Sequence, residues 1–412
     1  MLGIFNFLTH AVGYAFKGSR LYRAWLLFLA VLALWGGVAY IDQLTHGLIA
    51  TGMRDQVSWA FYIGNFTFLV GVAAAAIILI IPAYIYDWKP IKEVAILGEI
   101  LAISALTMCM GFVFVDIGRP DRCWHLIPML GRLNFPSSLL AWDVIVLNGY
   151  FLLNIVIVGY LLYCSYEKKH YNKNFVVPLI LLSIPVAIGI HTVTAFIYIG
   201  MAGRPFWNAS ILAPRFLASA MCSGPAVLLI LFQLLKRATH LDIKDEALWK
   251  IAEIMAYAMF INLFLLGAEV FKEVYSHGEH IIYFNYLFFG VGGHGPLIRY
   301  SWLSVFCSIV AFLLFIVPKT RRNPITLNIG CLLIYTGVYL EKGMCLVIPG
   351  MTPDTLGELY EYSPTLTELR IGVACFAVGF LVYTMLTKVA VAIMMGEFNR
   401  ETVEAAERGQ AI

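Results

Sequence analysis

Residues 59–86 read WAFYIGNFTFLVGVAAAAIILIIPAYIY, and this stretch is the clearest indication of the fold class of the chain. It contains no Glu, Lys or Arg and no Asp, and it exceeds the roughly 20 apolar residues that a helix needs to cross a bilayer. A helix of this kind is stable in lipid, because its backbone groups pair internally and its side chains need no water. The stretch therefore predicts a transmembrane helix.

The composition of the whole chain agrees with a membrane protein. Of 412 residues, 61% are hydrophobic and 13% are charged, with 28 basic and 25 acidic side chains. A soluble domain is nearer to roughly one-half apolar and one-quarter charged, so folding in water would expose large apolar patches. These values disfavour a soluble enzyme or a disordered chain, and a net charge of +3 is too small to indicate a nucleic-acid partner.

Other apolar segments resemble the first in length and lack of charge. Together they predict an all-α polytopic membrane protein with about ten transmembrane helices. The predicted spans are residues 24–41, 59–86, 94–115, 139–164, 175–200, 213–235, 250–271, 298–317, 323–347 and 369–395. The first apolar run lacks a small-x-small cleavage site, so we expect a retained helix instead of a signal peptide.

Basic residues are unequally divided between the two sides of these spans. With the N-terminus assigned to one side, 18 of the 28 Lys and Arg residues fall on that side and ten on the other. Cytoplasmic loops carry the excess of Lys and Arg. We therefore expect a multi-pass protein of the cytoplasmic membrane with both termini in the cytoplasm, and a surface helix or tail from Glu397 onwards.

Two runs of small residues suggest a repeat of four helices. FTFLVGVAAAA lies in the second predicted span and RFLASAMCSGPA in the sixth, and small residues allow helices to approach closely. We predict two four-helix bundles flanked by two extra helices. The expected divisions are residues 1–23 (cytoplasmic N-terminal segment), 24–58 (first flanking helix and outer loop), 59–200 (first bundle, quinone-binding), 201–347 (second bundle), 348–395 (outer loop and last flanking helix) and 396–412 (cytoplasmic tail).

Ionisable residues inside membrane spans are costly and are therefore functional candidates. Those near the expected outer face are Asp116, Asp143, His191, Arg215, Glu269 and Glu341, at the level of Tyr62 and Asn65. A polar pocket at one membrane face suits a quinone, whose head needs hydrogen bonds and proton exchange while its tail stays in lipid. Hydrogen bonds between helices are the alternative explanation of these residues.

The sequence carries no local signature of an intrinsic redox centre. His191 is the one histidine well within a predicted span, whereas a b-type haem in a helix bundle usually takes two. CxxC and CxxCH motifs are absent. We expect no intrinsic haem, no iron–sulfur cluster and no metal site, and we interpret the eight cysteines as small buried hydrophobes.

Several segments resemble the NrfD/polysulfide-reductase (PsrC-like) family of membrane subunits. They are WAFYIGNFTFLVGVA at 59–73, VDIGRPDRCWHL at 115–126, SSLLAWDVIVLNGY at 137–150, IHTVTAFIYIGMAGRPFW at 190–207, ILAPRFLASAMCSGPA at 211–226 and EKGMCLVIPG at 341–350. The resemblance covers about residues 20–395. HTVTAF, RFLASA and WDVIVLNGY look most like the DsrP branch, found in the DsrMKJOP complexes of sulfate- and sulfur-metabolising prokaryotes.

This resemblance implies a subunit of a menaquinol oxidoreductase complex in anaerobic respiration, linked to dissimilatory sulfur or sulfate metabolism. A subunit of this family carries no redox cofactor, binds menaquinone near the outer face and exchanges electrons with a ferredoxin-like iron–sulfur subunit docked there. The DsrMKJOP complexes imply three further partners. These are a multihaem cytochrome c, a haem b membrane subunit and a cytoplasmic iron–sulfur subunit related to heterodisulfide reductase.

The resemblance also implies a quinone site at the outer end of the first bundle. Asp116 and His191 are the expected catalytic residues, and Arg119 is expected to pair with Asp116 and hold it ionised. The quinone-binding candidates are Tyr62, Asn65, Asp116, Arg119, Trp142, Asp143, His191 and Arg215. The candidates for a proton path are Glu99, Glu253, Glu269 and Glu341, of which Glu269 and Glu341 alternatively stabilise the outer loops.

Two other classes of protein remain open from the residues alone. A secondary transporter or ion-translocating subunit would also have many spans and buried acids, but transporters place their sites near the midplane on broken helices. The polar residues here gather near one face. A purely structural membrane anchor gives no reason for Asp143, His191 and Glu341 inside the bilayer.

Overall fold

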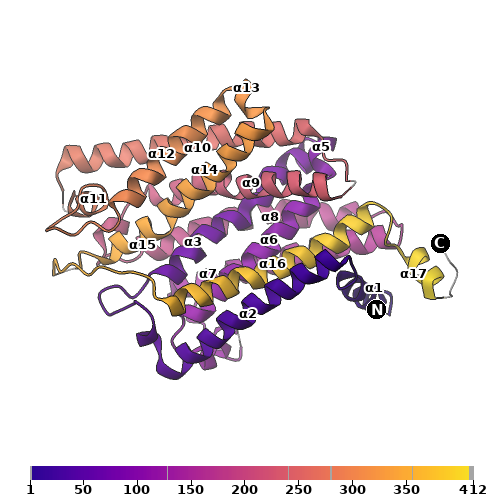
Figure 1. The fold of residues 1–412 in the computed structure, drawn as a ribbon, viewed down its shortest axis with the longest axis horizontal. Coiled ribbons are helices and arrows are strands. Elements are labelled where there is room, and N and C mark those ends of the chain that lie inside the picture. The colour runs from indigo at the N-terminus through magenta and orange to yellow at the C-terminus, as the bar shows by residue number, and fades with distance from the viewer. Residues whose placement is uncertain (1, 128, 240, 279–280, 355, 408–412) are drawn as a thin grey trace.

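The chain folds into long, roughly parallel and antiparallel helices in the computed structural model (Figure 1). The structure describes residues 2–127, 129–239, 241–278, 281–354 and 356–407. Ten helical segments in these ranges are long and apolar enough to cross a membrane, which confirms the ten predicted spans. The first and last described helices, α1 (Leu2–Ala15) and α17 (Arg400–Glu407), lie at one end of the molecule, which we call the terminal end, and we call the opposite end the loop end.

Several helices run further than the apolar segments that predict them. The first span is α2 (Arg20–His46) and the seventh is α10 (Asp245–Ser276), each extended at both ends beyond its predicted range. A helical backbone continues through polar interfacial residues until a cap stops it. Ser19 provides such a cap, because its hydroxyl accepts a hydrogen bond from the first turn of α2.

The first bundle is built from the second to fifth spans, which contact one another in a closed ring. Its helices are α3 (Phe61–Ala73), α6 (Ala95–Asp116), α7 (Leu139–Tyr166) and α8 (Lys173–Ile199). The span that begins with α3 continues through the short turns η2 (Ala74–Ala76), α4 (Ile77–Ile80) and η3 (Ile81–Ile85).

The second bundle repeats this arrangement with the sixth to ninth spans. Its helices are α9 (Leu212–Ala238), α10, α12 (Ile298–Ile316) and α14 (Pro324–Lys342), and the last of these continues after a break at Gly343 as α15 (Met344–Met351). The flanking helices α2 and α16 (Leu366–Met394) pack on each other, and α16 packs on α6. The expected pair of four-helix bundles with two flanking helices is therefore observed.

The remaining elements are short and lie near the ends of the spans. They are α1 (Leu2–Ala15), η1 (Leu48–Ala50), α5 (Lys89–Lys92), η4 (Pro120–Leu126), η5 (Pro205–Trp207), α11 (Ile281–Phe288), α13 (Pro318–Arg321) and α17 (Arg400–Glu407). Helix α17 confirms the expected surface helix in the charged C-terminal stretch, while Arg408 lies outside the described residues.

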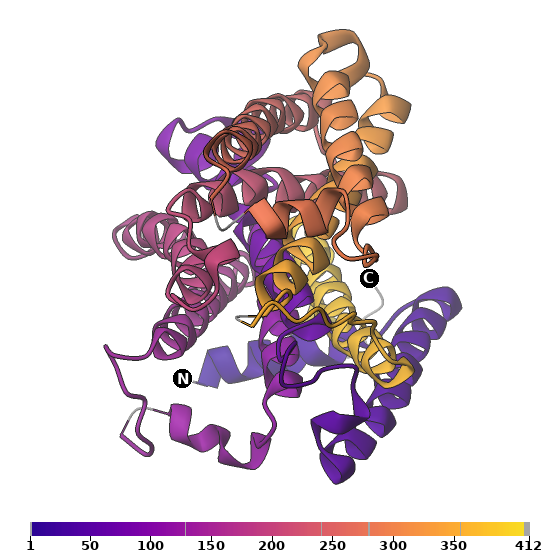
Figure 2. The ribbon, with the colours of Figure 1, turned by 90° about the vertical axis from the view of Figure 1, so that its left-hand side faces the viewer.

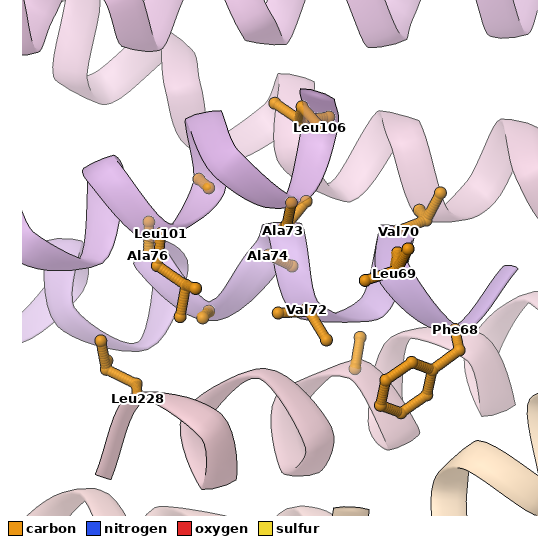
Figure 3. Packing of buried hydrophobic residues seen from close by; sticks show 14 of the residues in the cluster. Phe68, Leu69, Val70, Val72, Ala73, Ala74, Ala76, Leu101, Leu106 and Leu228 are labelled. Atoms are coloured by element: carbon orange, nitrogen blue, oxygen red, sulfur yellow. The ribbon is translucent and has the colours of Figure 1, made fainter. Parts of the chain in front are cut away.

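The two runs of small residues pack against each other at the junction between the bundles. A Cβ added to Gly224 of α9 would lie 2.9–3.0 Å from Ala75 of η2. Figure 3 shows this region, where Ala73, Ala74 and Ala76 lie on a segment that runs beside the helix that carries Leu228. Small side chains thus let α3–η2 and α9 approach closely, as the sequence predicted.

Tight packing also fixes the loop end, which Figure 2 views end-on. The Trp207 indole nitrogen donates to the Leu346 carbonyl oxygen at 2.9 Å. A Cβ on Gly350 would lie 1.8 Å from that ring, so only glycine fits there. Glu368 accepts hydrogen bonds from the Gly52 amide at 2.8 Å and the Tyr362 hydroxyl at 2.5 Å, and burial, reinforced by Glu368, raises the pKa of Tyr362.

Candidate functional site

Buried polar side chains gather in the halves of the spans that approach the loop end, and they form three separate groups. The aspartate groove lies between α6 and α7 around Asp143. The tyrosine–carboxylate cluster joins α2, α3, α6 and α16 around Tyr62 and Asp116. The arginine cavity lies within the second bundle around Arg215.

The aspartate groove is mostly apolar, and its lining includes the polar residues Asp143 and Asn148. Phe114 of α6, Ile127 beyond η4 and Leu140 of α7 are among its lining residues, and each exposes more than two-fifths of its surface. In a spanning region such exposed apolar side chains face lipid. Asp143 lines the same groove but is only 2% exposed. The groove therefore joins a buried carboxyl group to the lipid phase.

A second helix holds Asp143 in place. The Thr194 hydroxyl on α8 shares its proton between Asp143 Oδ1 at 3.1 Å and the Ile190 carbonyl oxygen of its own helix at 2.7 Å. His191 lies three residues earlier on α8, a spacing that brings side chains to the same side of a helix. Its Nδ1 lies 2.8 Å from the Ala187 carbonyl oxygen, and its buried Nε2 has no hydrogen-bond partner among the described residues. Asp143 and His191 thus come from neighbouring helices at nearly the same level.

Trp142 is next to Asp143 in sequence but points elsewhere. Its indole nitrogen donates to the Pro136 carbonyl oxygen at 2.8 Å, and its ring lies 4.6 Å from the ring of Phe135, centre to centre. Trp142 therefore fixes the segment that leads into α7, at the margin of the aspartate groove.

The tyrosine–carboxylate cluster faces the flanking helices. The Tyr62 hydroxyl donates to Gln43 Oε1 at 2.7 Å, and Gln43 Nε2 donates to the Val115 carbonyl oxygen at 2.7 Å. Asp116 follows Val115 at the end of α6, and its Oδ1 is buried without a hydrogen-bond partner in the described part of the chain. Tyr62 and Asp116 are thus in one cluster, but neither lines the aspartate groove.

The expected pair between Arg119 and Asp116 is wrong. The Arg119 guanidinium instead binds the Asp121 carboxylate through Nε at 3.0 Å and Nη2 at 2.9 Å. Both side chains are exposed, and the hydrogen bond from Arg119 lowers the pKa of Asp121. The physical reason is desolvation, because a guanidinium that reached Asp116 would have to leave water, whereas pairing with Asp121 leaves it hydrated.

The arginine cavity holds an ion-pair network that crosses three helices. Arg215 of α9 donates through Nε to Glu341 Oε1 of α14 at 3.0 Å and through Nη1 to Glu269 of α10. Asn262 Nδ2 donates to the other Glu341 oxygen at 3.1 Å. Arg215, one of the quinone-binding candidates, is therefore part of a network within the second bundle. Both glutamates are engaged by it.

Asn65 connects the two bundles. Its Nδ2 donates to the Phe61 carbonyl oxygen at 2.7 Å, and its Oδ1 accepts from the Tyr339 hydroxyl of α14 at 3.0 Å. Both polar ends of this side chain are therefore engaged by protein groups, and they are directed at α14 and the α3 backbone.

The two acids near the terminal end differ from each other. Glu99 is 1% exposed, and both of its carboxyl oxygens lack a hydrogen-bond partner among the described residues. Glu253 is partly exposed and pairs with Lys250 at 3.5 Å and Arg321 at 3.7 Å. Glu253 is thus part of a surface charge network, and Glu99 is a buried, isolated carboxyl group.

Metal-ligating residues do not cluster within the described ranges. No group of three or more His, Cys, Asp or Glu residues is placed there to hold a metal ion. All eight cysteines are free, and each one except the partly exposed Cys123 is buried, as expected of small hydrophobes. His240 and His280 lie outside the described residues.

Sequence reasoning missed two side chains that the structure places at these sites. Thr194, the donor to Asp143, lies within the HTVTAF segment, three residues after His191. Lys342 was counted as a loop charge, but it lines the arginine cavity and is only 4% exposed. The signal for Lys342 was its position next to Glu341 at the end of a predicted span.

The sequence matches a known protein family. The family model described as "Polysulphide reductase, NrfD" matches residues 50–353, which include both bundles, the aspartate groove and the arginine cavity. The chain belongs to the NrfD family. This NrfD-family chain is accordingly a multi-pass membrane protein, as the ten spans indicate.

Three curated relatives of this NrfD-family chain match it over nearly its full length. A Halobacterium salinarum protein described as a membrane subunit of dimethyl sulfoxide reductase is 26% identical, covering 87% of this chain and 89% of its own length. The "Hdr-like menaquinol oxidoreductase integral membrane subunit" of Archaeoglobus fulgidus is 20% identical over 88% and 92%. The "Menaquinone reductase, integral membrane subunit" of Nitratidesulfovibrio vulgaris is 22% identical over 88% and 90%.

Proposed function

We propose that this chain is the quinone-binding membrane subunit of a respiratory redox complex, and that menaquinol or menaquinone binds in the aspartate groove. The observation that carries the proposal is a buried carboxyl group in a mostly apolar groove that faces lipid. Such a site suits a polar head with a long apolar tail. Two relatives whose names include menaquinol or menaquinone support this choice of ligand.

Asp143, which lines the groove, supplies the proton chemistry in this proposal together with His191 and Asp116, which do not line it. Oxidation of the quinol releases protons together with electrons, so the site needs a group that accepts a proton. Asp143 takes this role, and Thr194 orients the carboxyl oxygen to which it donates. His191 provides an unpaired ring nitrogen one turn away on α8. Asp116, at the end of α6, passes protons on to the water beyond the loop end.

The proposal includes an orientation in the membrane and a set of partner subunits. The Lys and Arg distribution favours an orientation with the loop end outside, as expected of a protein with cytoplasmic termini. Trp124, Met129 and Leu130 expose apolar surface in the loop above the groove. A ferredoxin-like iron–sulfur subunit docked over this loop would receive the electrons. In its DsrP-like form, the proposed complex has three more partners and takes part in sulfur metabolism. These partners are a cytochrome c, a haem b subunit and a heterodisulfide-reductase-like subunit.

The burial of Glu99 supports one alternative function, in which the chain is an ion-translocating subunit. A buried carboxyl group without a partner in the described chain is costly in lipid, and such groups often mark proton relays. Glu253 would then be the cytoplasmic end of the path and the arginine cavity its outer part. Turnover that responds to membrane potential would distinguish this alternative from quinol oxidation at one face.

Replacing Asp143 with Asn in the assembled complex tests the proposal. The amide keeps the shape of the side chain but cannot accept the proton, so we expect menaquinol-dependent reduction of the partner subunit to fall about 100-fold, the lower end for general base catalysis. The control is Asn154→Ala, which removes a buried α7 amide that donates to the Tyr150 carbonyl oxygen and should leave turnover unchanged. Unchanged turnover in Asp143→Asn would exclude this role.

A further inference from the structure

The arginine cavity has features of a ligand site that the first bundle does not share. Its walls come from α9, α10, α11, α12 and α14, and its polar lining includes Arg215, Glu269, Glu341 and Lys342. Three of these are joined in the ion-pair network, whereas the fourth is not. What Lys342 binds is therefore the first question about this cavity.

Lys342 is a buried cation without a hydrogen-bond acceptor in the described residues. Its ammonium nitrogen lies 3.9 Å from the centre of the Phe216 ring, and the residue is 4% exposed. The nearby hydroxyl groups of Ser304 and Ser301 donate to the carbonyl oxygens of Gly337 at 2.7 Å and Leu297 at 3.0 Å, and neither oxygen accepts a hydrogen bond from Lys342. A buried ammonium group normally finds an acceptor. Lys342 thus offers a free donor to a ligand in the cavity.

The charges of the cavity select a neutral ligand. The positive charges of Arg215 and Lys342 balance the negative charges of Glu269 and Glu341. Glu273, which also lines the cavity, is bridged to Lys272 at 3.2 Å. An anionic headgroup would add an uncompensated charge in a region of low dielectric, whereas a neutral carbonyl would accept from Lys342 at no such cost.

An apolar groove leads from this cavity to the lipid-facing surface. The groove runs between α10 and α12 and shares Leu266, Val270, Phe284, Phe288 and Val305 with the cavity lining. Its other lining residues are apolar as well, and Phe289 and Trp302 expose more than half of their surface. The combination of cavity and groove accommodates a small polar head and a long apolar tail.

We propose that the second bundle holds a second isoprenoid quinone, with a head carbonyl oxygen hydrogen-bonded to Lys342 and the tail in the groove between α10 and α12. This inference uses residues of the second bundle only. It is therefore independent of the placement of menaquinol in the aspartate groove.

Photolabelling of the purified complex in nanodiscs tests this site. The probe is an azido-naphthoquinone with an isoprenoid tail, and labelled peptides are mapped by mass spectrometry. We expect labels on α10, α12 or α15 in addition to any on α6 and α7. Lys342→Met should reduce the second-bundle label about tenfold or more, as expected for loss of a hydrogen bond to a charged group, while Lys342→Arg should retain it.

Gly267 allows the tail path to be tested without disturbing the cavity. It lines the groove, and a Cβ placed on it meets no protein atom within 4 Å. Gly267→Leu should therefore fill the groove and reduce the second-bundle label about as much as Lys342→Met. Gly159 of α7 is equally open, so Gly159→Leu is the matched control and should leave this label unchanged.

The outcomes separate the two sites. Labels on α6 and α7 alone, or a second-bundle label that survives both Lys342→Met and Gly267→Leu, would overturn the second site and leave the first intact. A second-bundle label that anionic phospholipid displaces would also overturn it, since the cavity would then be a lipid site. Labels on the second bundle alone would support this inference and contradict the proposed placement in the aspartate groove.

Discussion

The aspartate groove and the arginine cavity are both polar sites beside lipid, but they hold their carboxyl groups differently. Asp143 is held by one neutral hydroxyl, whereas Glu341 is held by a guanidinium and an amide. Protonating Glu341 would disrupt a buried ion pair, which costs free energy because the guanidinium would be left buried without one of its carboxylate partners. Protonating Asp143 removes no charged partner. Proton exchange is therefore expected in the groove, whereas the cavity is built to keep its charges.

The largest effect is expected from removing the charge at the centre of the cavity. Arg215→Met leaves Glu269 and Glu341 buried without their cation, which should lower the free energy of unfolding by about 3–5 kcal/mol. The measurement is the thermal stability of the purified complex. Stability equal to that of the wild type would show that the network does not hold the second bundle together.

The exposed pair at Arg119 is the matched control for this variant. Arg119→Met removes a guanidinium that water hydrates, so the thermal stability at neutral pH should be unchanged. The pair itself depends on pH in a known direction. Arg119 lowers the pKa of Asp121, so whatever stabilisation the pair gives the folded chain is present at pH values above the ordinary pKa of a carboxyl group. This stabilisation is lost as the pH falls through the lowered pKa of Asp121.

A smaller effect is expected from loosening the carboxyl group in the groove. Thr194→Val removes the hydroxyl that donates to Asp143, so we expect quinol-dependent turnover to fall about tenfold, the size of one hydrogen bond to a charged group. The pH profile of turnover should move with it, and Thr194→Ser should restore both. Thr192→Val is the control, because that exposed hydroxyl donates to the Ile188 carbonyl oxygen on the same helix. A pH profile that stays unchanged in Thr194→Val would exclude Thr194 from the proton chemistry.

The smallest response is expected from membrane potential. If quinol releases protons and electrons at one face, no charge crosses the bilayer, and turnover in proteoliposomes should change by less than about twofold at roughly 100 mV. Moving one charge across that potential is worth roughly 2.3 kcal/mol, enough to change a rate about 50-fold. A response of that size would support charge movement through Glu99 instead.

The sequence correctly predicted those features of the fold that depend on the residues of a single helix. Each of the ten spans is visible in its own run of apolar residues, and the close approach of α3–η2 and α9 follows from their small residues. The side-chain pairs were harder, because they depend on which helices are neighbours. Arg215 was grouped with the quinone-binding candidates for this reason, although its carboxylate partners lie on α10 and α14.

The error at Arg119 has a different origin. Asp116 and Asp121 both lie within a few residues of Arg119, so the sequence alone offers two partners. The choice depends on solvent exposure, which only the folded chain defines. The same limit concealed Lys342, which is buried at the end of α14, beside the break at Gly343.

The position of the quinone head distinguishes the aspartate groove from every other polar group in the chain. A cryo-electron microscopy map of the assembled complex with a bound menaquinone analogue would locate it. We expect a head between α6 and α7, with one carbonyl oxygen within hydrogen-bond distance of Asp143. A head beside Tyr62 and Asp116, with lipid alone in the aspartate groove, would contradict the proposed function of the groove.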